Sequence, residues 1–137
     1  MDGYGRRVLV VDDDKNIRDL LFLLLERSGY SVHCAGDGLE ALHEMKQRRF
    51  DAVITDYHMP RMNGREFMVL SQVVRPNTPV IVLSGNTGDL ADRVIEQGAF
   101  AWVHKPYEAQ HLLSLLRSAM QQAPKHRWEH MRTRMSR

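Results

Sequence analysis

The sequence predicts a doubly wound α/β domain, in which a five-stranded parallel sheet is flanked by five helices. Short apolar runs of strand length alternate five times with segments whose apolar residues recur at helical spacing. Most of the strand runs contain a continuous apolar stretch, which is typical of parallel strands that are buried on both faces. Right-handed crossovers between such strands place helices on both faces of the sheet. The length of 137 residues, of which 43% are hydrophobic, suits one compact domain.

The first strand and the first helix are expected at Arg6–Val11 and Lys15–Ser28. The strand ends in Val-Leu-Val-Val, and the helix has apolar residues at positions 17, 20, 21, 24 and 25. Asp14 is placed to cap the helix, and Gly29 is placed to end it. Ser31–Ala35 follows as the second strand.

The second helix is expected to start at Asp37, which has Glu40 three positions later in a variant of the capping box. One face of this helix is expected to carry Leu39, Leu42 and Met45. Ala52–Thr55 follows as the third strand and is apolar through Val53 and Ile54.

The rest of the chain contains three further helices and two further strands. They alternate, beginning with a helix, over Arg65–Val74, Pro79–Leu83, Gly88–Gln97, Phe100–Val103 and Glu108–Gln121. Pro76 and Gly98 end the first two of these helices. The last helix is expected to direct inward Leu112, Leu115, Leu116 and Ala119.

Polar side chains follow four of the five predicted strands. They are Asp12, Asp13 and Asp14 after the first strand, Asp56 after the third, Ser84 after the fourth and Lys105 after the fifth. Each has a plainer interpretation when taken alone: an aspartate as a helix cap or turn residue, the serine as a turn former, the lysine as a solvated cation. Because the carboxyl ends of parallel strands meet at one edge of the sheet, these side chains are expected to converge in one cleft.

The convergence of carboxylates, a hydroxyl and an ammonium group favours phosphoryl-transfer chemistry. Crowded carboxylates raise one another's pKa unless a cation joins them, and oxygen ligands suit Mg²⁺. A carboxylate such as Asp56 that attacks a phosphoryl group needs its charge neutralised, and Mg²⁺ together with Lys105 would do this. The Ser84 hydroxyl would hydrogen-bond a phosphoryl oxygen.

Over residues 6–122 the chain resembles the receiver domain of bacterial two-component response regulators, the CheY-like family with a flavodoxin-like fold. The motifs that carry the resemblance are Val10-Val11-Asp12-Asp13, the stretch from Ile54 to Gly64 that contains Asp56, Val82-Leu83-Ser84-Gly85 and Val103-His104-Lys105-Pro106. Their joint spacing is specific, whereas each motif alone is not.

The resemblance implies a role for each of these residues. Asp56 would accept a phosphoryl group from a sensor histidine kinase or a phosphotransfer protein, and Lys105 would pair with the phosphate. Asp12, Asp13 and Asp56 would hold Mg²⁺, with the backbone carbonyl of His58 as a further ligand. Ser84 would be the switch hydroxyl. A cis peptide bond before Pro106 is a further expectation from the family.

Two positions depart from the commonest pattern of the family. The aromatic residue of the switch is usually tyrosine or phenylalanine, and here it is Trp102, whose plainer interpretation is a partly buried strand residue. The position two after Asp56 is His58, whose plainer interpretation is an exposed loop histidine. We hypothesise that His58 and Asn86 border the phosphoryl group and tune the access of water, and therefore the rate at which the switch turns off.

Composition excludes several other classes of protein. The longest apolar run, Leu20–Leu25, is far shorter than the roughly 20 residues of a membrane span. The single cysteine, Cys34, rules out an internal disulfide and is typical of a reducing compartment. Because the N-terminus also lacks the apolar stretch of a signal peptide, we expect a cytoplasmic location with no membrane association.

The basic pI of about 8.9 comes from the C-terminal residues. Residues 124–137 carry a net charge of +4, which leaves −2 for the rest of the chain, so the domain itself gives little reason to expect nucleic-acid binding. We expect residues 1–122 to form the domain and residues 123–137 to form a basic, helical extension or linker. Trp128, Met131 and Met135 give this extension an apolar stripe. The stripe would dimerise, pack on the domain, or, with its basic neighbours, contact an acidic partner or nucleic acid.

Three functions were weighed. The leading one is a phosphorylated receiver module that acts on a downstream protein or an output domain, alone or as a homodimer, and that is not an enzyme with a separate substrate. The second is a receiver-like interaction module that is not phosphorylated. The third is a phosphohydrolase of the haloacid-dehalogenase type, which the sequence disfavours because no threonine closely follows the aspartates at positions 12–14.

Overall fold

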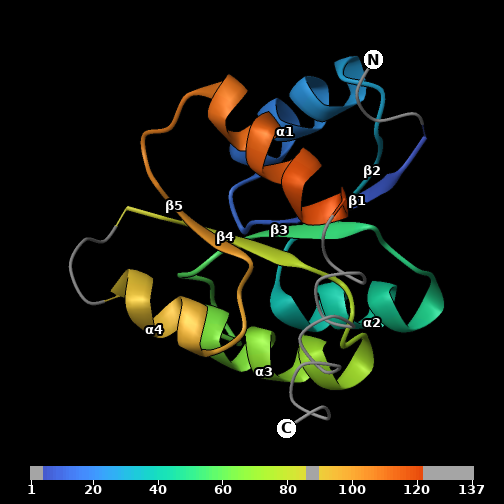
Figure 1. The fold of residues 1–137 in the computed structure, drawn as a ribbon. Coiled ribbons are helices and arrows are strands. Elements are labelled where there is room, and N and C mark those ends of the chain that lie inside the picture. The colour runs from blue at the N-terminus through green and yellow to red at the C-terminus, as the bar shows by residue number, and fades with distance from the viewer. Residues whose placement is uncertain (1–4, 86–89, 122–137) are drawn as a thin grey trace, which may run out of the picture.

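The computed structural model, which describes residues 5–85 and 90–121, contains the expected parallel sheet (Figure 1). Its strands are β1 (Arg7–Val11), β2 (Ser31–Ala35), β3 (Ala52–Asp56), β4 (Val80–Ser84) and β5 (Ala101–His104). All neighbouring strands pair in parallel in the order β2-β1-β3-β4-β5. The strand order changes direction between β1 and β3, so the topological switch point lies where these two strands end.

Helices cover both faces of the sheet. They are α1 (Lys15–Arg27), α2 (Gly38–Gln47), α3 (Gly64–Val74), α4 (Leu90–Glu96) and a fifth helix over residues 109–121. Figure 1 shows α1 and the fifth helix on one face, and α2, α3 and α4 on the other. The predicted doubly wound fold is therefore confirmed.

Two apolar cores lie on the two faces of the sheet, because successive strand side chains point to opposite sides. In β1, Leu9 belongs to the core under α2, α3 and α4, whereas Val10 belongs to the core under α1 and the fifth helix. Phe67 of α3 and Leu116 of the fifth helix are fully buried in their respective cores. This sandwich fixes the ends of β1, β3 and β4, where the polar residues lie.

The predicted caps of the first two helices are present. Asp14 Oδ1 accepts hydrogen bonds from the N–H groups of Asn16 (2.9 Å) and Ile17 (3.4 Å). Asp37 accepts the N–H of Glu40 at 2.8 Å, but the Glu40 carboxylate accepts the N–H of Gly36 instead of that of the cap residue. The reciprocal capping box occurs at α3, between Asn63 and Glu66, where the sequence analysis had not placed one.

Two leucines that belong to the predicted apolar patterns of their helices are exposed. Leu39 is 52% exposed, and the buried face of α2 carries Ala41 in its place, together with Leu42 and Met45. Leu20 of α1 is 68% exposed. In both helices the apolar pattern was wider than the stripe that the sheet and the neighbouring helices bury.

Several boundaries differ by one or two residues from those expected. β3 ends one residue later than expected, and β4 is shifted by one residue toward the C-terminus. Asp56 and Ser84 are therefore the last residues of their strands and are held by the sheet. Gly29 and Gly98 have positive φ angles of 95° and 107°, in agreement with their expected role in ending helices.

Two expected features lie outside the described residues: the start of the fourth helix before Leu90 and the extension of residues 123–137. Over the described ranges, no helix combines the length and the apolar character that crossing a membrane requires.

Candidate functional site

Three carboxylates meet at the carboxyl edge of the sheet, as the topology predicts. One oxygen from each of Asp12, Asp13 and Asp56 lies within 4.8 Å of the others. Asp12 directly follows β1 and is buried, Asp56 ends β3 and is partly buried, and Asp13 is exposed. Asp14 is not a member of the cluster, since its side chain caps α1.

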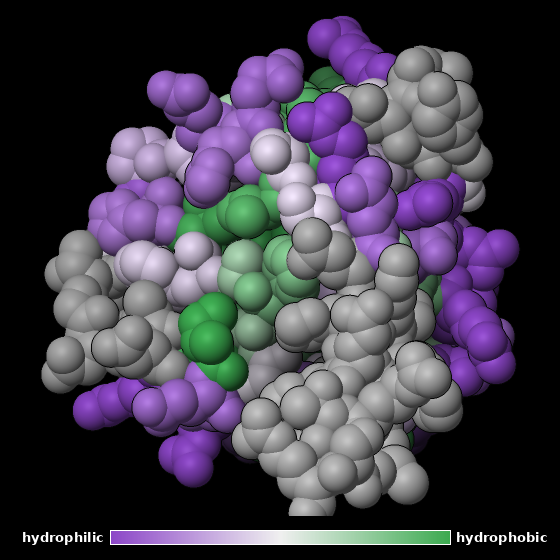
Figure 2. Space-filling view, viewed as in Figure 1, coloured by the Kyte–Doolittle hydropathy of each residue, from purple (hydrophilic) through white to green (hydrophobic). Residues whose placement is uncertain are grey.

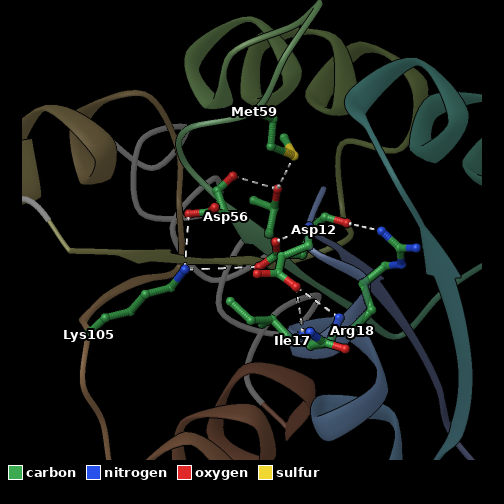
Figure 3. A network of polar contacts seen from close by, with 9 residues as sticks. Asp12, Ile17, Arg18, Asp56, Met59 and Lys105 are labelled. Atoms are coloured by element: carbon green, nitrogen blue, oxygen red, sulfur yellow. Dashed lines mark hydrogen bonds and ion pairs between the residues drawn. The ribbon is translucent and has the colours of Figure 1, made fainter.

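Lys105 supplies the positive charge of this cluster. Its Nζ lies 3.4 Å from Asp56 Oδ1 and 4.0 Å from Asp12 Oδ2. Figure 3 shows the lysine entering from the segment after β5 and pointing between the two carboxylates. One ammonium group faces three carboxylates, so the site is deficient in positive charge.

The pKa of the Asp12 carboxyl group is raised in this site. Burial raises the pKa of its carboxyl group, and the nearby Asp56 and Asp13 carboxylates raise it further, whereas a hydrogen bond from the backbone of Asp14 and the charge of Lys105 lower it. Its Oδ1 accepts the Asp14 N–H at 2.9 Å, but its Oδ2 is buried and has no hydrogen-bond partner among the described residues.

These oxygens suit a hard divalent cation. A buried carboxylate oxygen without a donor, close to two further carboxylates, is the type of environment that Mg²⁺ occupies through one or two carboxylates and several waters. The cation would also relieve the like-charge repulsion that raises the pKa of Asp12. The residues therefore fit Mg²⁺.

Ser84 lies beside this cluster at the end of β4. It follows Leu83, which is the register partner of Asp56, and it is fully buried. Its carbonyl accepts the N–H of Lys105 at 2.9 Å, which ties the end of β4 to the segment that carries the lysine. The peptide bond between Lys105 and Pro106 is cis, as expected.

Of the remaining predicted residues, Trp102 and His58 are not members of the carboxylate cluster, and one lies outside the described residues. Trp102, in β5, packs partly buried against the core under α4 and makes an edge-to-face contact with His104 at 5.6 Å. Its indole Nε1 is buried without a hydrogen-bond partner within the described ranges. His58 is exposed and packs edge-to-face on Tyr57. Asn86 lies outside the described residues.

The structure adds two residues that the sequence analysis did not identify. Thr55 is fully buried, and its Oγ1 donates a hydrogen bond to the Asp56 carbonyl at 2.9 Å and approaches Met59 Sδ at 3.9 Å. Arg18 of α1 donates from Nη1 to the Asp12 carbonyl at 2.7 Å. A threonine next to Asp56 was visible in the sequence, but nothing there connects position 18 with position 12.

The sequence model of the response regulator receiver domain family matches residues 8–117, which contain every residue of this cluster. The chain belongs to this family. Receiver domains are the phosphoacceptor modules of two-component signalling, they bind Mg²⁺ in their active site, and they are signalling modules that work with histidine kinases and output domains.

Individual relatives agree with this assignment. This chain is 37% identical over 121 residues to the DNA-binding transcriptional regulator NtrC of Bradyrhizobium sp. (strain RP501 Parasponia). The aligned region covers 88% of this chain and 25% of NtrC. The chemotaxis protein CheY4 of Vibrio cholerae superposes with a TM-score of 0.77 at 35% identity, over 84% of this chain and 98% of CheY4. The beryllofluoride-activated NtrC4 receiver domain dimer superposes with a TM-score of 0.81 at 31% identity, over 90% and 99% of the two chains.

Proposed function

We propose that Asp56 is the residue on which this receiver domain is phosphorylated, and that Asp12, Asp13 and Asp56 hold the Mg²⁺ that the reaction requires. The observation that carries the proposal is the cluster of three carboxylates within 4.8 Å, with Lys105 Nζ 3.4 Å from Asp56. The backbone carbonyl of His58 is a further proposed ligand, as the resemblance to the family implies.

The chemistry follows from the charges. When bound, Mg²⁺ would neutralise carboxylate charge and bind a phosphoryl oxygen. An oxygen of the ionised Asp56 carboxylate attacks phosphorus, the new P–O bond gives an aspartyl phosphate, and the bond to the phosphohistidine nitrogen of the donor breaks with its electron pair on that nitrogen. The Lys105 ammonium group pairs with the phosphoryl oxygens, and the Ser84 hydroxyl donates a hydrogen bond to one of them.

Phosphorylation would then alter the surface around β5. The movement of Ser84 toward the phosphoryl group is proposed to draw Trp102 inward, with the indole as the switch aromatic. Figure 2 shows apolar side chains gathered over β5 and towards α4, with hydrophilic side chains around them. A cavity of about 550 Å³ on this side is lined by Trp102, Val103, His104, Pro106, Tyr107, Glu108 and His111.

The partners belong to the same proposal. A sensor histidine kinase or a phosphotransfer protein would donate the phosphoryl group, and a downstream protein or an output domain would respond to it. The chain spans 25% of NtrC, 50% of the regulator MprA from Mycobacterium sp. (strain KMS) and 16% of the sensory/regulatory protein RpfC from Xanthomonas campestris. A homodimer is proposed by analogy with the NtrC4 receiver domain dimer.

The test is chemical phosphorylation. The protein is incubated with Mg²⁺ and acetyl phosphate, and its intact mass is measured. Wild type and Asp51→Asn, which alters an exposed carboxylate at the opposite edge of the sheet, are expected to gain one acid-labile phosphoryl group, and Asp56→Asn is expected to gain none. An adduct on Asp56→Asn, or none on wild type, would contradict the proposal, and the latter result would favour an interaction module that is not phosphorylated.

We also propose that His58 and Asn86 tune the lifetime of the aspartyl phosphate. His58 follows Asp56 by two residues and is exposed, so its ring can meet water that approaches the phosphoryl group. His58→Ala is expected to change the rate of autodephosphorylation, while His43→Ala, an exposed histidine of α2, leaves it unchanged. Equal rates in wild type and His58→Ala would defeat this part of the proposal.

A further inference from the structure

Arg18 makes a contact that the phosphorylation chemistry does not use. It lies in the first turn of α1, and its Nη1 donates a hydrogen bond to the backbone carbonyl of Asp12 at 2.7 Å. Figure 3 shows Lys105 and Arg18 approaching Asp12 from opposite sides, the lysine toward the carboxylate and the arginine toward the carbonyl. A guanidinium donor makes this bond stronger than one between neutral groups.

This bond is one of three hydrogen bonds that hold Asp12 in place. The Asp12 N–H donates to the carbonyl of Ala35 in β2 at 3.1 Å, and Oδ1 accepts the N–H of Asp14 at 2.9 Å. With the carbonyl held by Arg18, every polar group of Asp12 except Oδ2 has a hydrogen-bond partner among the described residues. These hydrogen bonds therefore direct Oδ2, which is buried and lies 4.0 Å from Lys105 Nζ, to the carboxylate cluster.

The charge of Arg18 is directed away from that cluster. A Cβ atom placed on Gly36 would lie 3.5 Å from both Arg18 Nη1 and Glu40 Oε2, so the guanidinium lies next to the segment between β2 and α2. The charged groups that shift the pKa of Asp12 are Asp56, Lys105 and Asp13, and Arg18 is not among them. Arg18 consequently acts on Asp12 through the position of its backbone.

We propose that Arg18 is a positioning residue for Mg²⁺, which holds the segment after β1 so that Asp12 Oδ2 is presented to the cation. This inference rests on the proposed role of the carboxylate cluster. Mg²⁺ tolerates little deviation in the placement of its ligands. Without Arg18 the Asp12 peptide would lose its charged donor and rotate, and Oδ2 would be displaced from Asp13 and Asp56.

The test compares Arg18→Met and Arg18→Lys with Arg27→Met, which removes an exposed arginine from the last turn of the same helix. Mg²⁺ affinity is measured by calorimetry on the unphosphorylated protein, and thermal unfolding is measured on the same samples. We expect Arg18→Met to weaken Mg²⁺ binding by roughly tenfold, the size typical of a lost support behind a metal ligand. Arg18→Lys should restore part of this loss, and Arg27→Met should match wild type.

Amide hydrogen exchange without Mg²⁺ gives a second measurement. The Asp14 N–H donates a hydrogen bond to Asp12 Oδ1, so we expect this amide to exchange faster in Arg18→Met than in wild type. Exchange in β3 and β4 should be unchanged. If Arg18→Met does not fold, Arg18→Lys carries the test, because lysine keeps the charge and loses the planar fork. Unchanged Mg²⁺ affinity in the folded Arg18 variants would overturn this inference but not the proposed function. An absence of Mg²⁺ binding in wild type would overturn the proposed function and this inference with it.

Discussion

The substitution Asp12→Asn should stabilise the protein in the absence of Mg²⁺. In the native cluster, the oxygens of Asp12 and Asp56 are at most 4.8 Å apart, and Asp12 Oδ2 is 4.0 Å from Lys105 Nζ. At an effective dielectric constant of about 20, the repulsion from Asp56 is at least about 3.5 kcal/mol and the attraction to Lys105 about 4 kcal/mol, so the two nearly cancel. The repulsion from the exposed Asp13 is screened by solvent and adds less. What remains is the cost of burying Oδ2 without a hydrogen bond, about 1–3 kcal/mol.

An asparagine amide would remove that cost, because its oxygen still accepts the Asp14 N–H and its nitrogen can donate toward Asp56. We expect a gain of about 2 kcal/mol, which for a domain of about 120 residues raises Tm by about 8 °C. Thermal unfolding in EDTA at pH 7, followed by circular dichroism, measures it. The control Asp19→Asn alters an exposed ion pair with Lys15 and should change stability by less than about 1 kcal/mol.

Both a lower pH and Mg²⁺ should reduce the stability advantage of Asp12→Asn. The pKa of Asp12 is raised in the folded protein, so the folded state binds more protons than the unfolded state as pH rises from the unfolded pKa to the folded pKa. The penalty is absent below the unfolded pKa and fully present above the folded one, so the variant's advantage should shrink as the pH falls. Mg²⁺ at ten times its Kd should stabilise wild type by about 1.4 kcal/mol and the variant by less. A variant less stable than wild type in EDTA would refute the reasoning.

Three further changes test the site and its support. Lys105→Met should slow phosphorylation by acetyl phosphate by about 100-fold, since it removes the cation 3.4 Å from Asp56, without weakening Mg²⁺ binding. Gly64→Ala should lower stability by about 1–3 kcal/mol in chemical denaturation, since its Cβ would lie 2.8 Å from the Tyr57 carbonyl oxygen and force the segment after Asp56 to shift. Phe67→Ala should cost about 3–5 kcal/mol in the same assay, because the ring is fully buried.

Matched control variants separate these effects from a nonspecific loss of stability. Gly85→Ala is the control for Gly64→Ala, because a Cβ at Gly85 would meet no atom of the described residues within 4 Å, and the stability of this variant should be close to that of wild type. Val69→Ala is the control for Phe67→Ala, because Val69 lies on the same helix and is 51% exposed. Equal losses in either pair would contradict the structural explanation. Mg²⁺ binding that weakens in Lys105→Met would show that the lysine supports the cation site instead of competing with the cation.

Most of the fold could be predicted from the sequence because the strands are short and the central ones, β1, β3 and β4, carry continuous apolar runs. Val80–Ser84 is buried at every position, and such a run fits only a strand covered on both faces. The helices were predicted less well in their orientation. Leu20 and Leu39 are apolar residues on exposed faces, and a sequence pattern does not distinguish them from core residues when apolar residues extend beyond one stripe.

The candidate site, like the fold, was predicted from the sequence only in part. The sequence by itself determined that Asp12, Asp13, Asp56, Ser84 and Lys105 would arrive at one edge, because parallel strands carry their carboxyl ends to the same side. Only the tertiary structure decided which of these groups is buried, that Asp12 Oδ2 has no hydrogen bond, and that Arg18 holds the Asp12 carbonyl. Burial and side-chain contacts depend on how the helices pack over the sheet, and that packing sets the pKa of Asp12 and the orientation of its carboxylate.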